Sequence, residues 1–143
     1  NASIVERLGM RAIVTTMLGA QIVASALACA LFWSGAVRGE LAFAVYVAWT
    51  TGVFFQAGLT LGNLNALAME PMGHLAGLTA SVAGSIATVL AVCLAVPIGL
   101  MFDGTPRPLM TGTLALAIGA FALMRMLRRV ERSDPALATA AVE

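Results

Sequence analysis

The residues with the most obvious chemistry lie in one short stretch, NALAMEPMGHLAG, which runs from Asn65 to Gly77. It holds Glu70 and His74, and the latter is the single histidine of the chain. A metal ion needs several protein ligands, and no further histidine, cysteine or carboxylate lies nearby in the sequence. We therefore expect no metal site. We interpret the stretch as a helix start, with proton or substrate chemistry and a conformational role as alternatives.

Pro71 supports the interpretation as a helix start. A proline fits the first turn of a helix, where its missing N–H costs no hydrogen bond. The residue before it, Glu70, is biased toward an extended conformation, so the chain turns there. The carboxylate of Glu70 then meets the positive end of the helix dipole, and His74 lies one turn into the helix.

The composition of the whole chain is that of a membrane protein. Of its 143 residues 60% are hydrophobic and 10% are charged, whereas soluble domains are about a quarter charged and less than half apolar. All the basic residues are arginines, and they form no stripe that would suit nucleic acid. No nucleophile–base group, metal cluster or phosphate-binding loop is present in the sequence, so we expect neither an enzyme nor a cofactor. Cys29 and Cys93 stand in apolar runs, and we expect both to be small buried side chains.

Four apolar segments are long enough to cross a bilayer, which takes roughly 20 residues of helix. They span about residues 12–34, 41–63, 71–101 and 109–127. The links between them are short, so consecutive helices should be antiparallel neighbours. The sequence thus predicts an all-α polytopic membrane protein. A loop covers residues 1–11, the four-helix region covers residues 12–130, and a disordered tail covers residues 131–143.

The arginines indicate how the chain is oriented in the membrane. Six of the eight lie on the side of the two termini, and Arg38 and Arg107 lie in the loops of the other side. Positive charge favours the cytoplasmic side, so we expect both termini in the cytoplasm and the chain in the inner (plasma) membrane. The stretch from residue 65 to 77 is then at the cytoplasmic edge of the membrane.

The second span carries a polar stripe. Positions 46, 49, 53, 56, 60 and 63 share one helix face, and unpaired polar groups are costly in hydrocarbon, so this face should point at other helices or at a water-filled cavity. Interhelical hydrogen bonding and a substrate cavity both remain open as interpretations. The candidate cavity residues are Tyr46, Trp49, Gln56 and Asn63, of which Gln56 is the best placed.

The third span carries small residues at every fourth position, and these allow another helix to approach closely. They would serve static packing and a sliding surface equally well. The residues of this ridge are Gly73, Gly77, Ser81 and Ser85, with Gly84 beside them. The first and fourth spans have few polar residues, and we expect them to be peripheral.

Two segments resemble a known family. The run GNLNALAMEPMGHLAGLTASVAGS resembles the region from the tenth to the eleventh helix of drug:proton antiporters of the major facilitator superfamily, with the bicyclomycin/chloramphenicol-resistance branch as the closest resemblance. The start, NASIVERLGMR, resembles the superfamily's loop motif G-x-x-x-D-R-x-G-R-[RK]. The matching residues are Glu6, Arg7, Gly9 and Arg11, while Asn1 and Met10 depart from the motif.

This resemblance implies that the chain corresponds to helices nine to twelve of a twelve-helix bundle. It implies proton-coupled export of small amphipathic compounds by alternating access. The second span would line the cavity, the third would pack between the two halves, and the segment from Pro71 to Gly77 would be a docking end for a loop of the first half. The family's membrane-embedded proton carboxylate is not in this chain. The expected partners are therefore the bilayer, an amphipathic substrate, protons, and the remaining helices or a partner chain.

Two other readings remain. A small four-helix transporter that dimerises would have a similar length, but such proteins use a carboxylate in the first span, and this span has none. A membrane interaction or assembly subunit without transport is the other. It would be favoured if Tyr46, Trp49 and Gln56 were packed and dry.

Overall fold

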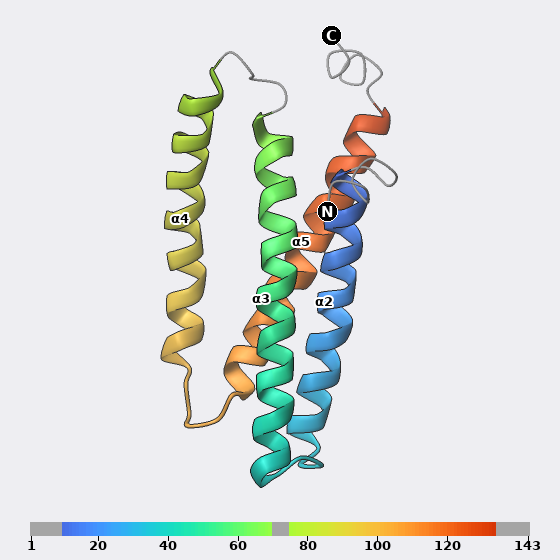
Figure 1. Ribbon diagram of the computed structural model, residues 1–143, viewed down its shortest axis with the longest axis vertical. Helices are drawn as coiled ribbons and strands as arrows, with labels where there is room; N and C mark the ends of the chain where they lie inside the picture. Colours follow the sequence, from blue (N-terminus) through green and yellow to red (C-terminus); the bar gives the residue numbers. More distant parts are fainter. Residues whose placement is uncertain (1–9, 70–74, 134–143) are drawn as a thin grey trace.

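The computed structural model describes residues 10–69 and 75–133, which form four long helices (Figure 1). They are α2 (Met10–Trp33), α3 (Gly39–Met69), α4 (Ala76–Leu100) and α5 (Arg107–Ser133). Each contains a segment that is long and apolar enough to span a bilayer: Ala12–Trp33, Gly39–Ala66, Gly77–Leu100 and Arg107–Leu127. The prediction of an all-α polytopic membrane protein is confirmed.

Two helices run further than the apolar pattern predicted. The second span was expected to end at residue 63, but α3 continues to Met69, because residues 64–69 are mostly good helix formers and Pro71 comes only after them. Similarly, α5 continues through the arginine-rich segment to Ser133, beyond the expected start of the tail at residue 131. The described part of α4 begins at Ala76, with Leu75 at the N-cap position and no side-chain cap.

The helix α2 is the centre of the packing. It lies along both α3 and α5, whereas α4 makes few contacts with α3 and α5. Figure 1 shows α4 set apart beside α3, with α5 running obliquely behind. The expectation that the first span is peripheral is therefore wrong for the described residues. Gly19 of α2 lies beside α5, since a Cβ added there would be 3.9 Å from the Phe121 ring, an ordinary contact distance.

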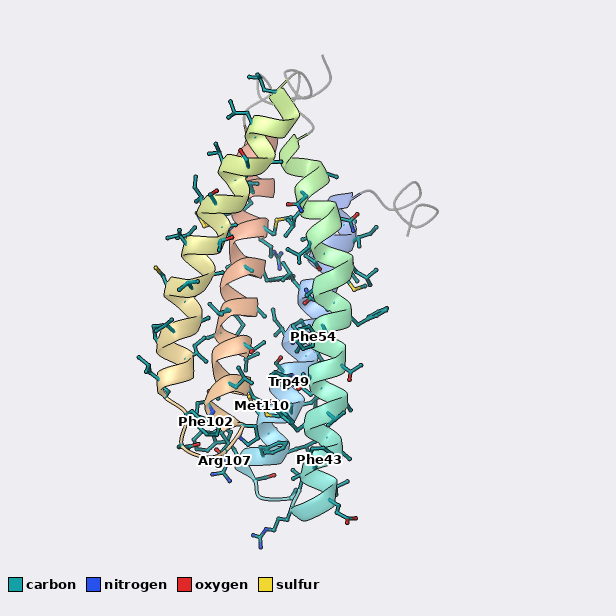
Figure 2. The ribbon with its side chains drawn as sticks, turned by 60° about the vertical axis from the view of Figure 1, so that its left-hand side comes forward. Phe43, Trp49, Phe54, Phe102, Arg107 and Met110 are labelled. Carbon is teal, nitrogen blue, oxygen red and sulfur yellow. The ribbon has the colours of Figure 1, made fainter. Side chains whose placement is uncertain are left out.

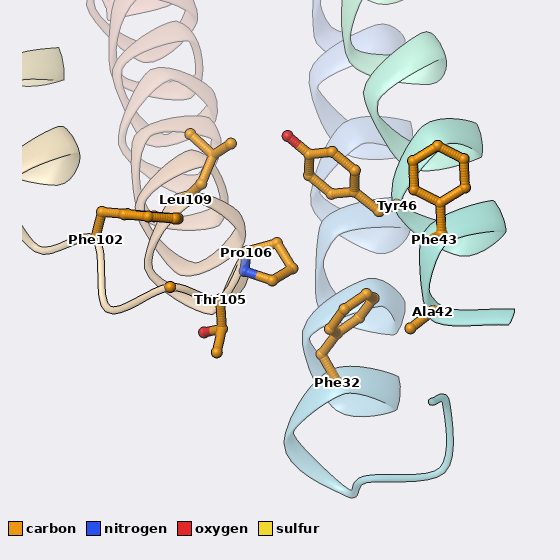
Figure 3. Close-up of a pocket in the computed structure, with 9 residues that line it drawn as sticks. Phe32, Ala42, Phe43, Tyr46, Phe102, Thr105, Pro106 and Leu109 are labelled. Atoms are coloured by element: carbon orange, nitrogen blue, oxygen red, sulfur yellow. The ribbon is translucent and has the colours of Figure 1, made fainter. Parts of the chain in front are cut away.

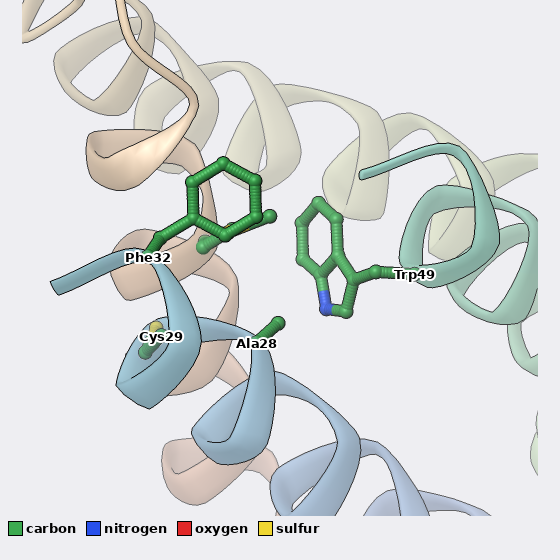
Figure 4. Packing of buried hydrophobic residues seen from close by; sticks show 5 residues of the cluster. Ala28, Cys29, Phe32 and Trp49 are labelled. Carbon is green, nitrogen blue, oxygen red and sulfur yellow. The ribbon is translucent and has the colours of Figure 1, made fainter. Parts of the chain in front are cut away.

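A compact cluster joins these three helices (Figure 4). It consists of Ala28, Cys29 and Phe32 of α2, Trp49 of α3 and Met110 of α5. Met110 is completely buried. Because lipid tails are as apolar as these side chains, the cluster stabilises the bundle through close packing more than through transfer out of water.

The contact between α4 and α5 depends on Gly112. A Cβ added at this position would lie 2.7 Å from the Cδ1 and Cγ2 atoms of Ile98. The bare backbone of α5 therefore accommodates the Ile98 side chain near the end of α4. Gly119 lies about two turns further along α5. Nothing lies within 4 Å of a Cβ added at this position, so it makes no comparable contact.

Candidate functional site

The buried polar side chains of α2 and α3 form the first part of the site, which we call the polar seam. At its centre the Ser25 hydroxyl accepts two hydrogen bonds, one from Gln21 Nε2 at 2.8 Å and one from Trp49 Nε1 at 3.1 Å. Gln21 and Ser25 belong to α2 and Trp49 belongs to α3, so the seam bonds the two helices together. All three side chains are buried.

The predicted polar stripe of α3 does face inward, but its residues differ in burial and in their hydrogen-bond partners. Trp49 and Asn63 are buried, and Tyr46 and Gln56 are half-buried. Only Trp49 bonds to another helix. Gln56 Nε2 donates to Thr60 Oγ1 at 3.1 Å and Asn63 Nδ2 donates to the Leu59 carbonyl at 2.8 Å, both within α3.

Thr50 is the unsatisfied member of the seam. Its hydroxyl oxygen is buried and has no hydrogen-bond partner among the described residues. Leaving a buried hydroxyl unpaired costs about 1–3 kcal/mol. The hydroxyl of Thr50 is therefore a point of α3 at which the packing leaves a polar group without a partner. Trp49, the neighbouring residue, is already paired with Ser25.

The small-residue ridge of α4 is exposed at Gly77, Ser81 and Gly84. Nothing lies within 4 Å of a Cβ added at Gly77 or Gly84, so the ridge packs against no other described helix. The Ser81 and Ser85 hydroxyls donate to carbonyls of their own helix, those of Leu78 and Ser81, at 3.0 and 2.8 Å. Their polar groups are thus satisfied, and the face is ready to meet an apolar surface. Gly73, the first member of the ridge, lies outside the described residues.

The remaining predicted positions are not described in side-chain detail. The loop residues Glu6, Arg7 and Gly9 and the helix-start residues Glu70, Pro71 and His74 lie outside the described residues. Arg11 falls in the first turn of α2, with its side chain outside the description. The predicted docking end from Pro71 to Gly77 and the predicted loop motif therefore remain predictions.

The two cysteines differ from each other. Cys29 is buried in the cluster of Figure 4, as expected, and Cys93 is exposed on α4. The prediction that both are buried is wrong for Cys93, because no other described helix covers its part of α4.

Within residues 10–69 and 75–133, no group of three histidine, cysteine or acidic residues could hold a metal ion.

A second feature, the aromatic pocket, lies at the end of the bundle where α2 ends and α3 and α5 begin (Figure 3). Its volume is about 370 Å³, within the range of small-molecule sites. Its walls are almost entirely apolar. It is lined by Phe32, Ala42, Phe43, Tyr46, Phe102, Gly104, Thr105, Pro106 and Leu109.

The loop between α4 and α5 shapes one wall of this pocket. Gly104 has a φ of 84°, which a residue with a side chain adopts only with strain. Asp103 Oδ1 accepts bonds from the Thr105 amide at 3.0 Å and from the Thr105 hydroxyl at 2.6 Å, which closes a turn. This turn presents Phe102 and Pro106 on either side of the loop.

Comparisons with models of protein families, with curated proteins and with solved structures found no match for this chain. Its assignment as a multi-pass membrane protein rests on its own composition and helices.

Sequence reasoning missed the aromatic pocket. Of its lining residues it singled out only Tyr46, and for a different reason. A signal was nevertheless present: Phe32, Phe43 and Phe102 all flank the two short loops expected on the same side of the membrane. Aromatic residues at span ends are common as membrane anchors, so this signal alone does not distinguish anchors from the walls of a pocket.

Proposed function

We propose that this chain is part of a proton-coupled efflux transporter for small amphipathic compounds, in an inner (plasma) membrane with both termini in the cytoplasm. The observation that carries the proposal is the state of Gln56. This amide is half-buried, stands on the inward face of a membrane-spanning helix, and is bonded only to Thr60 of the same helix. It can exchange this partner for a substrate group without separating any two helices.

Trp49 makes the contrast clear. Its indole N–H is committed to Ser25 on α2, so using it for a ligand would break the bond between the two helices. We therefore assign Trp49 to the scaffold and Gln56 to the cavity wall.

The uncovered state of α4 also supports membership of a larger bundle. None of the apolar segment Gly77–Leu100 is buried among the described residues, and its small-residue ridge is free to receive another helix. In the proposed transporter the other half of the bundle covers this face. The four described spans contain no acidic residue away from their ends, so the proton carrier belongs to the helices outside this chain.

Export measurements in cells test the proposal. The full native protein should lower the accumulation of a fluorescent amphipathic cation such as ethidium or of a neutral amphipathic dye. Gln56→Ala should change the export of at least one of them several-fold at equal protein level. Thr51→Ala is the matched control, because Thr51 lies on the same helix, is exposed, and bonds only to the Val47 carbonyl at 2.8 Å. Unchanged export of every compound by Gln56→Ala would refute the cavity assignment.

A membrane assembly subunit without transport is the second candidate, and the bond between Trp49 and Ser25 favours it. This bond shows that part of the polar stripe serves packing. The size of the native polypeptide, detected with an antibody against the segment Ser133–Glu143, separates the two candidates. A band near three times 14.7 kDa favours the transporter, and a band at 14.7 kDa favours the subunit.

A further inference from the structure

The aromatic pocket lies at a defined level of the membrane. Phe32 stands at the end of the span Ala12–Trp33, and Tyr46 stands two helical turns into the span that begins at Gly39. At 1.5 Å per residue the pocket extends from the level of the span ends, where headgroups meet acyl chains, to about 10 Å further inward. An occupant therefore has its body among acyl chains and its end among headgroups.

The apolar walls of the pocket suit the apolar part of a ligand, and the pocket is open on one side. Phe43 and Phe102 are 70% and 69% exposed, so among the described residues the pocket is open to a molecule that approaches through the bilayer. Figure 2 shows both rings at the same end of the bundle as Arg107. Among the lining side chains only Tyr46 and Thr105 carry polar atoms, and the Thr105 hydroxyl is already bonded to Asp103.

Charges of both signs flank the pocket in the sequence, with Arg38 and Glu40 just before Ala42 and a second pair in the loop before α5 and at the start of that helix. Asp103 stands between Phe102 and Gly104, which both line the pocket, and Arg107 follows Pro106. The hydrogen bonds from Thr105, together with the nearby charge of Arg107, hold the pKa of Asp103 below its usual value, so this carboxylate is ionised at neutral pH. The guanidinium of Arg107 lies over the Trp33 ring, 5.5 Å from its centroid, which keeps it at this end of the bundle.

These observations define the chemistry of an occupant. It has a long apolar body, it arrives from within the bilayer, and its polar end carries a positive and a negative group. An anionic lipid would satisfy Arg107 but would meet the carboxylate of Asp103, and an organic cation would satisfy Asp103 but would meet Arg107. A zwitterion suits both, and the positive start of α5 at Arg107 adds to the attraction for a phosphate.

We propose that the aromatic pocket binds a phospholipid with a zwitterionic amine headgroup. One acyl chain lies between Phe43 and Phe102, the phosphate lies toward Arg107, and the ammonium lies toward Asp103. The site does not include Gln56, although Tyr46 of the predicted cavity face also lines it, and it does not depend on the transport proposal.

Native mass spectrometry of the purified full chain tests this site. After removal of lipid, the chain is titrated with dioleoyl phosphatidylethanolamine and, separately, with dioleoyl phosphatidylglycerol, which has the same acyl chains and an anionic headgroup. Phosphatidylethanolamine should bind several-fold more tightly. Phe43→Ala should weaken both lipids by about fivefold, equivalent to about 1 kcal/mol, because it removes a contact with the acyl chain. Asp103→Asn should weaken only phosphatidylethanolamine.

Phe54→Ala is the matched control. Phe54 lies on the same helix as Phe43, is 74% exposed, and does not line the pocket, so its loss should leave both affinities unchanged. Circular dichroism establishes that each variant retains its helices. Equal affinities of the unmodified chain for the two lipids would overturn the headgroup assignment. Equal effects of Phe43→Ala and Phe54→Ala would overturn the location. Tighter binding of tetraphenylphosphonium, with displacement of the lipid, would overturn the phospholipid proposal and would identify the occupant as an organic cation.

Discussion

The indole N–H of Trp49 on α3 donates a hydrogen bond to the hydroxyl of Ser25 on α2, with 3.1 Å between nitrogen and oxygen. Ser25 is completely buried and also accepts a bond from Gln21. This is a hydrogen-bonded connection between two membrane-spanning helices. Hydrogen bonds of this kind stabilise helical membrane proteins by about 0.6–2 kcal/mol.

Ser25→Ala should lower the free energy of unfolding by about 1–2 kcal/mol, because it leaves the buried donors of both Gln21 and Trp49 unpaired. Trp49→Phe should cost less in hydrogen bonding, since Ser25 keeps its bond from Gln21. Titration with SDS in mixed micelles, followed by circular dichroism, measures both values. Ser81→Ala is the control, because the Ser81 hydroxyl is exposed and bonds only within α4. Equal stabilities of the Ser25→Ala and Ser81→Ala variants would contradict the role of the seam.

Gly112→Ala should lower the free energy of unfolding by about 1–3 kcal/mol through overpacking. The new methyl group would lie 2.7 Å from two atoms of Ile98, and this branched side chain has little freedom to move away. Gly119→Ala on the same helix should leave stability unchanged or raise it by up to about 1 kcal/mol, because it has open space and alanine favours the helix. The same SDS titration compares the two variants.

A second substitution checks the cause of this loss. In the double variant Gly112→Ala with Ile98→Ala, the methyl group no longer meets the isoleucine, so part of the stability should return. If the double variant is less stable than Gly112→Ala alone, the steric explanation is wrong.

Gly77→Leu should leave the stability of the described bundle unchanged, since nothing lies within 4 Å of an added Cβ at this position. The steric clash expected from the sequence therefore needs a helix that is not among the described ones. If another helix packs on the ridge in the native assembly, Gly77→Leu should reduce the amount of assembled protein recovered by gel filtration. Val89→Leu, also exposed on α4, is the control. Normal assembly of Gly77→Leu would refute close packing on the ridge.

Asp103 should make the turn between α4 and α5 sensitive to acid. Because folding lowers the pKa of this carboxyl, its contribution to stability is complete above the usual aspartate pKa near 4 and is lost as the pH falls through the folded value. The melting temperature should therefore fall less between pH 6 and pH 2 in Asp103→Asn than in the unmodified chain. Thr105→Val, which removes the hydroxyl bonded to Asp103, should raise the carboxyl pKa in an NMR titration. An unchanged pKa in that variant would contradict the turn.

The number and type of the helices could be predicted from the sequence, because four apolar runs of sufficient length admit few other structures. The inward face of α3 could be predicted as well, since polar residues such as Gln56 and Asn63 recur at helical spacing. In both cases the signal is local. Length and periodicity are properties of a single segment.

The neighbours of each helix could not be predicted in this way. Apolar residues of α2 occur on every face of the helix. The periodicity of its sequence therefore did not indicate that it would contact both α3 and α5. Cys29 and Cys93 stand in similar apolar runs, yet one is buried and the other exposed. The aromatic pocket likewise depends on three chain segments meeting at one end, and Phe32 and Phe102 are far apart in the sequence.

The burial of Met110 has a consequence for biosynthesis. Three of the cluster's side chains are on α2 and one is on α3, but the cluster is complete only when Met110 of α5 reaches them. During translation α2 and α3 enter the membrane well before α5 leaves the ribosome. A nascent chain that stops before residue 107 therefore exposes Ala28, Phe32 and Trp49 to lipid and to the quality-control machinery. Completion of this cluster waits for α5, so α5 is the helix that commits α2 and α3 to their final packing.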